Sequence, residues 1–246
     1  MNYYISGISG FTGAAFATYL KERGESVFGI PRTMTMKDLI CYFDDNEPDY
    51  IINLSTYGNH YYQTDISEMA QSNIINTYNI LEALRHFDYI RFYHVSTSSV
   101  KFGVPTLYSI TKQCGEQVAA MYPRVTISRP YSIYGEGEAL HRFIPTVIAS
   151  LKSGREMILD ETATHDWIYI EDCIRAILDG KTEIGRGVAV TNLEVVRMLE
   201  EISGMKLNYL SGSFRTDGID NWKADVGVYG INLFEGLKRV YDKFKW

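Results

Sequence analysis

The chain has 246 residues, of which 46% are hydrophobic and 22% are charged, and its formal net charge is −6. This composition is that of a globular protein with a sizeable core, and the acidic balance disfavours nucleic acid and anionic membranes as partners. The sequence has no targeting pattern, no run of about 18 apolar residues and no paired cysteine framework, so we expect a cytoplasmic protein without a membrane span.

Short apolar segments alternate with helical patterns along the first half of the chain. The segments that predict strands are 3–6, 25–30, 49–55, 89–99 and 124–130. Those that predict helices are 12–24, 36–46, 66–87 and 109–122. This alternation predicts an α/β fold, a doubly wound parallel sheet of the Rossmann type with helices on both faces.

The pattern changes after Tyr134. Helical patterns follow at 141–154, 193–204 and 232–246, and a strand pattern lies at 187–192. We expect residues 1–133 to form a dinucleotide-binding Rossmann core and residues 134–246 to form mainly a small carboxyl-terminal substrate-binding lobe. The strand near 187–192 is expected to return to the core.

The stretch GISGFTG places three glycines at intervals of three between the first strand and the first helix. In this setting Gly7 permits a tight turn, Gly10 lets a pyrophosphate approach the backbone, and Gly13 lets the helix pack closely against the strand. Phe11 and Thr12 lie at the start of the helix, where free N–H groups and the helix dipole favour an anion. The stretch therefore predicts a dinucleotide-binding loop.

A second pattern, YSITK, places Tyr108 and Lys112 four residues apart in a predicted helix. Residues at this spacing lie on one face, so the ammonium group would favour the phenolate and lower the pKa of the tyrosine. The hydroxyl-rich stretch VSTSSV ends the preceding strand, and ligands bind beyond the carboxyl ends of such strands. Together the two stretches predict a general acid–base site.

These stretches resemble, in order along nearly the whole chain, the extended short-chain dehydrogenase/reductase family that acts on nucleotide sugars. GISGFTG is similar to the family's G-x-x-G-x-x-G, and YSITK is similar to its Y-x-x-x-K. The stretches SNIINTYNILEAL, VSTSSVKFG, RPYSIYGEGE and HDWIYIEDCIRAI resemble further motifs of this family. We identify the chain as a member of it.

The resemblance implies a role for each matching residue. Tyr108 is the expected acid–base residue, Lys112 the ligand of the nicotinamide ribose, and Ser98 the residue that hydrogen-bonds the sugar hydroxyl, with Thr97 as the neighbouring alternative. The cofactor groove is expected to be lined by Leu54, Ser55, Thr56 and Asn73. Hydride then passes between the nicotinamide and a sugar carbon, most often C4.

Two positions depart from the family pattern and weaken the expected diphosphate site. His165 stands where the family has arginine, and Ser132 stands where it has asparagine. Arg142 and Arg215 are expected to compensate, although a solvent-facing role for Arg142 fits the sequence equally well. The histidines show no ligand spacing, so no metal is expected.

The second strand runs into Pro31-Arg32-Thr33 instead of ending in an acidic residue that would accept a hydrogen bond from the ribose 2′-hydroxyl. An arginine and a hydroxyl group suit a 2′-phosphate, so NADP is expected as the cofactor. The alternative is that Arg32 faces solvent and NAD is bound.

The reaction stays open between a nucleotide-sugar 4-epimerase and a 4-ketoreductase. Ser98 is followed by Ser99 and Val100, where the family's 4,6-dehydratases carry an acidic pair, so dehydration is disfavoured. A non-catalytic NADP-sensing protein is the alternative outside enzymes. The resemblance also implies a homodimer through a four-helix bundle, with apolar positions such as Ile74, Tyr78, Leu81, Val118 and Met121.

Overall fold

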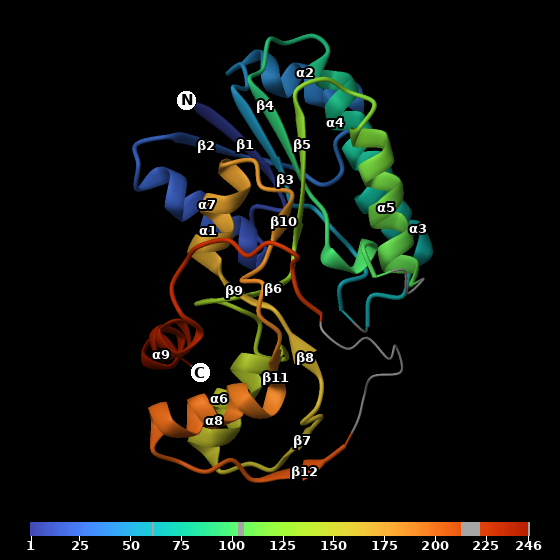
Figure 1. Ribbon diagram of the computed structural model, residues 1–246. Helices are drawn as coiled ribbons and strands as arrows, with labels where there is room; N and C mark the ends of the chain where they lie inside the picture. Colours follow the sequence, from blue (N-terminus) through green and yellow to red (C-terminus); the bar gives the residue numbers. More distant parts are fainter. Residues whose placement is uncertain (61, 103–105, 213–221, 246) are drawn as a thin grey trace. The chain divides into compact units, whose positions relative to one another are not determined.

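The computed structural model describes residues 1–60, 62–102, 106–212 and 222–245 (Figure 1). The chain divides into two compact units. The first contains Met1–Arg129 and Ile177–Thr182, and the second contains Pro130–Ala176 and Glu183–Trp246. The boundary falls four residues before the predicted one, and the segment that returns to the first unit is not the expected 187–192.

A parallel sheet forms the centre of the first unit. Its strands are β1 (Asn2–Ser6), β2 (Ser26–Ile30), β3 (Tyr50–Asn53), β4 (Arg91–Val95) and β5 (Val125–Pro130). The short edge strand β10 (Glu183–Ile184) completes the sheet and directly follows residues 177–182 of this unit. The strand order is β10-β5-β4-β3-β1-β2. The register places Ser6 beside Asn53 and Asn53 beside His94, so these three polar residues lie level at the carboxyl ends of their strands.

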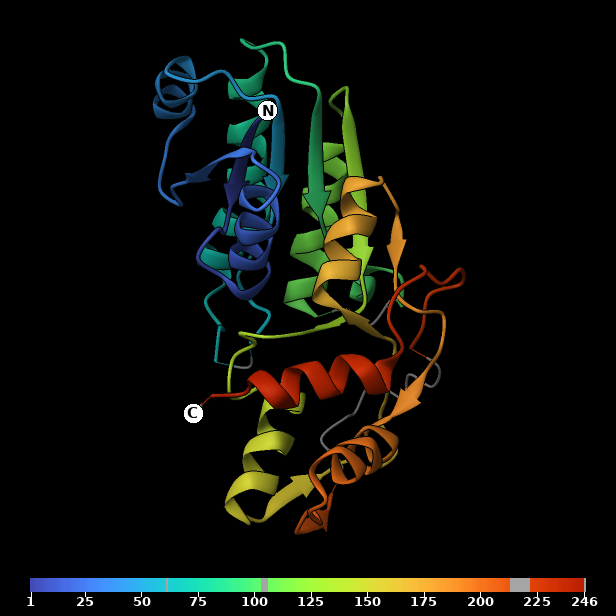
Figure 2. The same cartoon turned by 90° about the vertical axis from the view of Figure 1, so that its left-hand side faces the viewer.

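Helices cover both faces of this sheet, which confirms the predicted Rossmann-type fold. The helix α1 (Phe11–Lys21) lies on one face (Figures 1 and 2), and α3 (Ile66–Ala70), α4 (Asn76–Leu84) and α5 (Leu107–Ala119) lie together on the other. The helix α2 (Met36–Asp44) packs beside α4 and begins with a capping box between Thr35 and Asp38. Burial of the apolar residues of β1, β3, β4, α2 and α4 forms the core, which includes Tyr4, Phe43, Ile51, Leu81 and Phe92.

The segment 66–87 is not the single regular helix that its pattern predicts. The five-residue π-helix η1 (Gln71–Ile75) lies between α3 and α4. A π-helical turn accommodates one residue more than an α-helical turn, so it rotates the residues that follow about the helix axis. Here the turn contains Ser72 and Asn73, both of which are buried.

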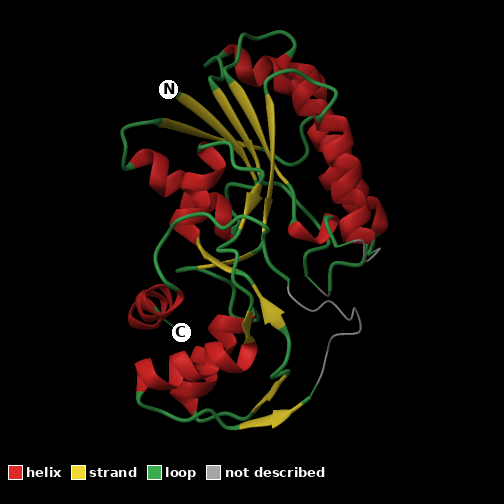
Figure 3. Ribbon diagram, in the orientation of Figure 1, coloured by secondary structure: helices red, strands yellow, loops and turns green. Residues whose placement is uncertain are grey.

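In its described residues, the second unit combines helices, red in Figure 3, with three small two-stranded sheets, whose strands are yellow. Its strands are β6 (Ser132–Tyr134), β7 (Met157–Leu159), β8 (Thr164–His165), β9 (Trp167–Tyr169), β11 (Val190–Thr191) and β12 (Tyr209–Ser211). Its helices are α6 (Phe143–Ser153), α8 (Asn192–Ser203) and α9 (Leu233–Lys243), and α7 (Ile170–Leu178) runs from this unit into residues 177–182 of the first. No helix within the described ranges is long and apolar enough to cross a membrane.

The expected strand 187–192 does not join the central sheet. Only Val190 and Thr191 are in strand conformation, and they pair antiparallel with β8. The strand position beside β5 is taken by β10, seven residues earlier in the chain. Buried Asp166 fixes the segment between them, because its carboxylate accepts hydrogen bonds from the N–H groups of Arg186 (2.6 Å) and Gly187 (2.8 Å).

Candidate active site

The strand order of the first unit defines where a ligand can bind. From β1 the chain crosses to β2 on one side and then to β3 on the other side, so β1 and β3 are neighbours at the point where the winding reverses. In open parallel sheets the crevice beyond the carboxyl ends of such strands binds the ligand. The glycine loop follows β1 here, and residues 54–57 follow β3.

The three glycines of the loop differ in how much room they have. Gly7 has φ +71°, and a Cβ on Gly13 would lie 2.1 Å from the Gly7 carbonyl oxygen. The fold itself therefore requires glycine at both positions. Gly10 has an ordinary backbone conformation, and a Cβ there would meet only the Gly7 oxygen, at 3.3 Å.

Gly10 is also the N-cap of α1, and as a glycine it has no side chain to cap the N–H groups of this first turn. The room at Gly10 and the uncapped start of α1 are the two features that a pyrophosphate needs. Phe11 and Thr12 are the first two residues of α1, as the sequence predicts. The loop therefore fits a dinucleotide.

Ser6 connects the two loops that flank this crevice. Its hydroxyl donates to Asn53 Oδ1 (2.6 Å) and accepts from the N–H groups of Leu54 (3.1 Å) and Ser55 (3.0 Å). A Cβ on Gly7 would lie only 3.1 Å from the Ser55 nitrogen, so the loops touch through their backbones. Leu54 and Ser55 thus stand beside the glycine loop, where the resemblance places the cofactor groove.

Asn53 extends this polar row to β4. Its Nδ2 group donates to Thr77 Oγ1 (3.0 Å) and to His94 Nδ1 (3.1 Å). Burial, reinforced by the positive charge of Lys112, holds the pKa of His94 well below its usual value, so the imidazole is neutral. Sequence reasoning missed Ser6, Asn53 and His94, because only the strand register brings them together.

Asn73 lies in the π-helical turn and points to the loop after β3. Its Oδ1 accepts from Thr56 Oγ1 and from the Tyr57 N–H, both at 3.0 Å. Its Nδ2 donates to the Tyr57 carbonyl and to Thr111 Oγ1, both at 2.9 Å. The amide is thus saturated by protein groups, so Asn73 fixes the loop that carries Thr56 and has no group left over for a cofactor.

Tyr108 and Lys112 lie one helical turn apart on α5, which begins with a capping box between Thr106 and Ser109. Tyr108 is partly buried, and only 2% of Lys112 is exposed. The ammonium group of Lys112 donates to the Val95 carbonyl (2.7 Å) at the end of β4. Burial lowers the pKa of Lys112 to about 8, and the carboxylate of Glu116 opposes that shift.

The hydroxyl cluster follows directly after β4, and its 3-10 turn η2 (Ser98–Val100) packs against α5. Thr97 caps this turn: its Oγ1 accepts from the Ser99 N–H and donates to Ser99 Oγ, both at 3.2 Å. Ser98 is buried. The cap thus engages the Thr97 hydroxyl within the turn.

Arg32 follows β2, at the edge of the same crevice. Its guanidinium group donates to Glu68 Oε2 and to Ser72 Oγ, both at 2.8 Å, and stands 5.4 Å from the centre of the Tyr57 ring. The predicted ligand of a 2′-phosphate therefore already has a carboxylate partner from α3.

Three of the predicted substrate residues belong to the second unit. Ser132 Oγ and His165 Nδ1, the two departures from the family pattern, are 3.0 Å apart and form a hydrogen bond. Arg142 is the N-cap of α6 and contacts Glu138 at 3.5 Å. Burial raises the pKa of Glu138 to about 7. Arg215 lies outside the described residues.

The parallel sheet and the glycine loop define an α/β protein with a Rossmann-type fold, in which Tyr108 and Lys112 lie on one helix. Residues 3–179 match the family model of the NAD dependent epimerase/dehydratase family, and the chain belongs to this family. This confirms the family that the sequence motifs indicated. No group of three or more metal-ligating side chains is arranged to hold a metal ion within the described ranges.

Curated relatives carry two different activities. A dTDP-glucose 4,6-dehydratase of Neisseria gonorrhoeae is 26% identical over 56% of this chain and 53% of its own. A UDP-glucuronate 4-epimerase of Thermodesulfobacterium geofontis is 21% identical over 98% of this chain and 95% of its own. The chain spans about half the length of the first of these.

Among solved structures, MoeE5 in complex with UDP-glucuronic acid and NAD has a TM-score of 0.84 at 22% identity, with 98% of each chain covered. A UDP-glucose 4-epimerase of Thermotoga maritima with UDP-glucose has a TM-score of 0.82 at 20% identity, again with 98% of each chain covered. These likenesses establish the fold.

Proposed function

We propose that this protein transfers a hydride between a nicotinamide dinucleotide and C4 of a nucleotide-linked hexose, as a 4-epimerase or a 4-ketoreductase. The observation that carries the proposal is the placement of Tyr108, Lys112 and Ser98 at the carboxyl edge of a sheet whose glycine loop fits a dinucleotide. When bound, the nicotinamide supplies the hydride acceptor or donor.

Proton transfer falls to the side chains of the chain itself. Tyr108 takes the proton from the C4 hydroxyl as hydride leaves and returns it when the ketone is reduced. The ammonium group of Lys112 stabilises the phenolate, and buried Ser98 hydrogen-bonds the sugar oxygen. The row Ser6–Asn53–His94 holds the loops on which these contacts depend.

Dehydration is the second candidate, since several relatives are 4,6-dehydratases. That reaction must remove a proton from C5 and protonate the departing C6 hydroxyl, so it needs an acid and a base besides Tyr108. Ser99 and Val100 supply neither after Ser98. The sequence therefore supports epimerisation or ketone reduction over elimination.

NADP is the proposed cofactor, on the ground that Arg32 stands where an acidic residue would recognise the 2′-hydroxyl of NAD. Several of the structures that share the fold contain NAD, which is a property of those proteins. The pairing of Arg32 with Glu68 bears directly on this choice.

A homodimer is proposed through α4 and α5, which pack side by side. Tyr78 and Met121, two of the apolar positions named from the sequence, are exposed, as are Ile75, Leu107 and Ile110. Leu81 was misassigned to this surface: it is 1% exposed and packs in the core between α4 and the sheet. Exposed apolar residues on two adjacent helices fit a second copy of the same surface.

The reaction can be tested with UDP-glucose, UDP-glucuronic acid and dTDP-glucose deuterated at C4, each incubated with the protein and either cofactor in H₂O and in D₂O. A 4-epimerase inverts C4 and keeps the label there. A 4-ketoreductase leaves these sugars unchanged and oxidises NADPH or NADH only with a 4-keto sugar. Solvent deuterium at C5 of a 4-keto-6-deoxy product indicates a dehydratase and refutes the proposal. Cofactor binding without turnover of any substrate indicates a sensor.

A further inference from the structure

The loop after β2 is hydrogen-bonded to the helical segment formed by α3, η1 and α4. Arg32 donates to Glu68 Oε2 on α3 and to Ser72 Oγ in the π-helical turn. The Arg32 carbonyl accepts a hydrogen bond from Asn76 Nδ2 (3.3 Å) at the start of α4. Residues of α3, η1 and α4 thus all form hydrogen bonds with Arg32.

Arg32 lies just beyond the carboxyl end of β2. In doubly wound sheets, residues at this position bind the ribose of the adenosine. The end of β2 lies against the glycine loop, because a Cβ on Gly29 would come within 2.8 Å of Ile8 Cγ2. On the other side, the Arg32 guanidinium group stands near the ring of Tyr57, from the loop after β3.

Glu68 is held in place independently of Arg32. Asp65 caps α3, with its Oδ1 accepting from the Glu68 N–H (3.1 Å), so Glu68 lies in the first turn of the helix. The Arg32–Glu68 pair is about half exposed on both sides, and exposed pairs are weak. A ligand can displace the Glu68 carboxylate from Arg32, but the carboxylate remains nearby.

The two charges act in opposite directions on the ribose 2′ position. A guanidinium group binds a phosphate through charge-assisted hydrogen bonds, whereas a carboxylate repels it and accepts a hydrogen bond from a hydroxyl group. We propose that Glu68 on α3 is a specificity-determining residue of the cofactor site, which opposes Arg32 and lowers the affinity for a 2′-phosphate relative to a 2′-hydroxyl. This inference rests on the proposed function only in that the chain binds a nicotinamide dinucleotide.

The test measures dissociation constants of NAD and NADP for the wild type, Glu68→Gln, Arg32→Ala and the double variant. Glu68→Gln should tighten NADP binding about three- to tenfold, the size of one partly screened charge interaction, and change NAD binding less than twofold. Arg32→Ala should weaken NADP selectively. In the double variant, the gain from Glu68→Gln should shrink, since no guanidinium group is released by the change.

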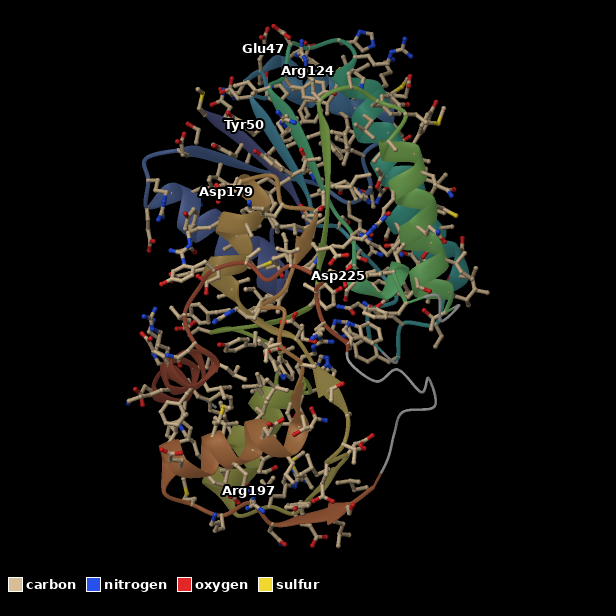
Figure 4. The ribbon with its side chains drawn as sticks, viewed as in Figure 1. Glu47, Tyr50, Arg124, Asp179, Arg197 and Asp225 are labelled. Atoms are coloured by element: carbon tan, nitrogen blue, oxygen red, sulfur yellow. The ribbon has the colours of Figure 1, made fainter. Side chains whose placement is uncertain are left out.

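Glu47→Gln is the matched control for the loss of one carboxylate. Glu47 and Arg124 lie at the opposite edge of the sheet, before β3 and β5 begin (Figure 4). This control should leave both affinities unchanged. An unchanged NADP-to-NAD affinity ratio in Glu68→Gln would overturn the inference, as would an equal gain in Glu47→Gln. If the wild type binds neither dinucleotide, the proposed function itself fails, and that result is distinguishable from the others.

Discussion

At the scale of single residues, the proposed acid–base site contains a lysine whose charge is buried. Lys112 is nearly fully buried on α5, and its ammonium group has one hydrogen-bond acceptor, the Val95 carbonyl, among the contacts described here. Glu116, one turn further along α5, opposes the loss of charge, but its carboxylate also accepts two hydrogen bonds from Arg129, at 2.9 and 2.5 Å. The protein therefore retains a charge where an apolar side chain would be more stable.

The first prediction concerns the stability of Lys112→Met. Burial lowers the pKa of Lys112 from 10.5 to about 8, so the cost of the buried charge is fully present below pH 8. Between pH 8 and 10.5 the unfolded chain binds a proton that the native state does not, and this cost disappears as pH rises. At pH 7 the substitution should raise the free energy of unfolding by about 1–3 kcal/mol, less than the full shift because the Val95 carbonyl loses its donor.

Thermal unfolding of the cofactor-free wild type and variant at pH 7 and pH 10 measures this effect. The two melting temperatures should converge at the higher pH while the variant stays inactive at both. A wild type that is the more stable protein at pH 7 would contradict the description of Lys112 as a buried charge.

The second prediction separates chemistry from binding at Tyr108. The substitution Tyr108→Phe retains the ring on the first turn of α5 and removes only the proton that the proposed reaction moves. Turnover should fall by about 10²-fold or more, and cofactor affinity should change less than threefold. The same measurement on Thr97→Val, which removes the cap of η2 but not the buried Ser98 hydroxyl, should show a smaller loss. Turnover close to that of the wild type in Tyr108→Phe would refute its assignment as the acid–base residue.

At the scale of elements, the sequence predicted motifs whose residues are close together in the chain, but not contacts between different strands of the sheet. The spacing of Gly7 and Gly13 predicted a loop against a helix, and Tyr108 and Lys112 fell on one helix as expected. The resemblance to the family implied that Asn73 lines the cofactor groove. The π-helical turn places it against residues 56 and 57 instead. The row Ser6–Asn53–His94 depends on strand register between segments more than forty residues apart, which the sequence does not display.

The third prediction compares substitutions at two glycines of the loop, one expected to lower stability and the other to lower cofactor affinity. Gly13→Ala would place a Cβ 2.1 Å from the Gly7 carbonyl oxygen, so α1 or the loop must move, at a cost of roughly 1–3 kcal/mol or more. At Gly10 a Cβ would approach only the Gly7 oxygen, at 3.3 Å, so Gly10→Val requires a small shift and should destabilise the protein less than Gly13→Ala. Its branched side chain would occupy the place of the pyrophosphate, so dinucleotide affinity should fall by about 10²-fold or more. If Gly10→Val binds the cofactor with normal affinity, the loop is only a structural turn and its assignment as a dinucleotide-binding loop is wrong.

At the scale of the whole molecule, the two units divide the expected work between them. The first contains the glycine loop, the acid–base pair and the hydroxyl cluster, and the second contains Ser132, Arg142 and His165, which were predicted as substrate residues. On this division, substitutions at Ser132, Arg142 or His165 should change the affinity for the nucleotide sugar and leave that for the cofactor unchanged. The strand β10 was missed because two strand residues are too few to show a period.

The last prediction concerns association through the first unit. Ile75 and Tyr78 on one side, and Leu107 and Ile110 on the other, are each three residues apart and more than 40% exposed. Ile75 ends the π-helical turn, Tyr78 lies on α4, and both elements pack against α5, which carries Leu107 and Ile110. We therefore expect the four side chains to form an apolar surface that a second copy can cover. Tyr78→Glu would bury a carboxylate in that interface and should convert a homodimer to a monomer in sedimentation at micromolar concentration. Its melting temperature as a monomer should remain measurable, because Tyr78 is not part of the core cluster. Tyr229→Glu, at a fully exposed tyrosine of the second unit, is the matched control and should leave the dimer intact. A wild type that sediments as a monomer would refute the homodimer, and a Tyr78→Glu variant that dimerises as tightly as the wild type would refute this interface.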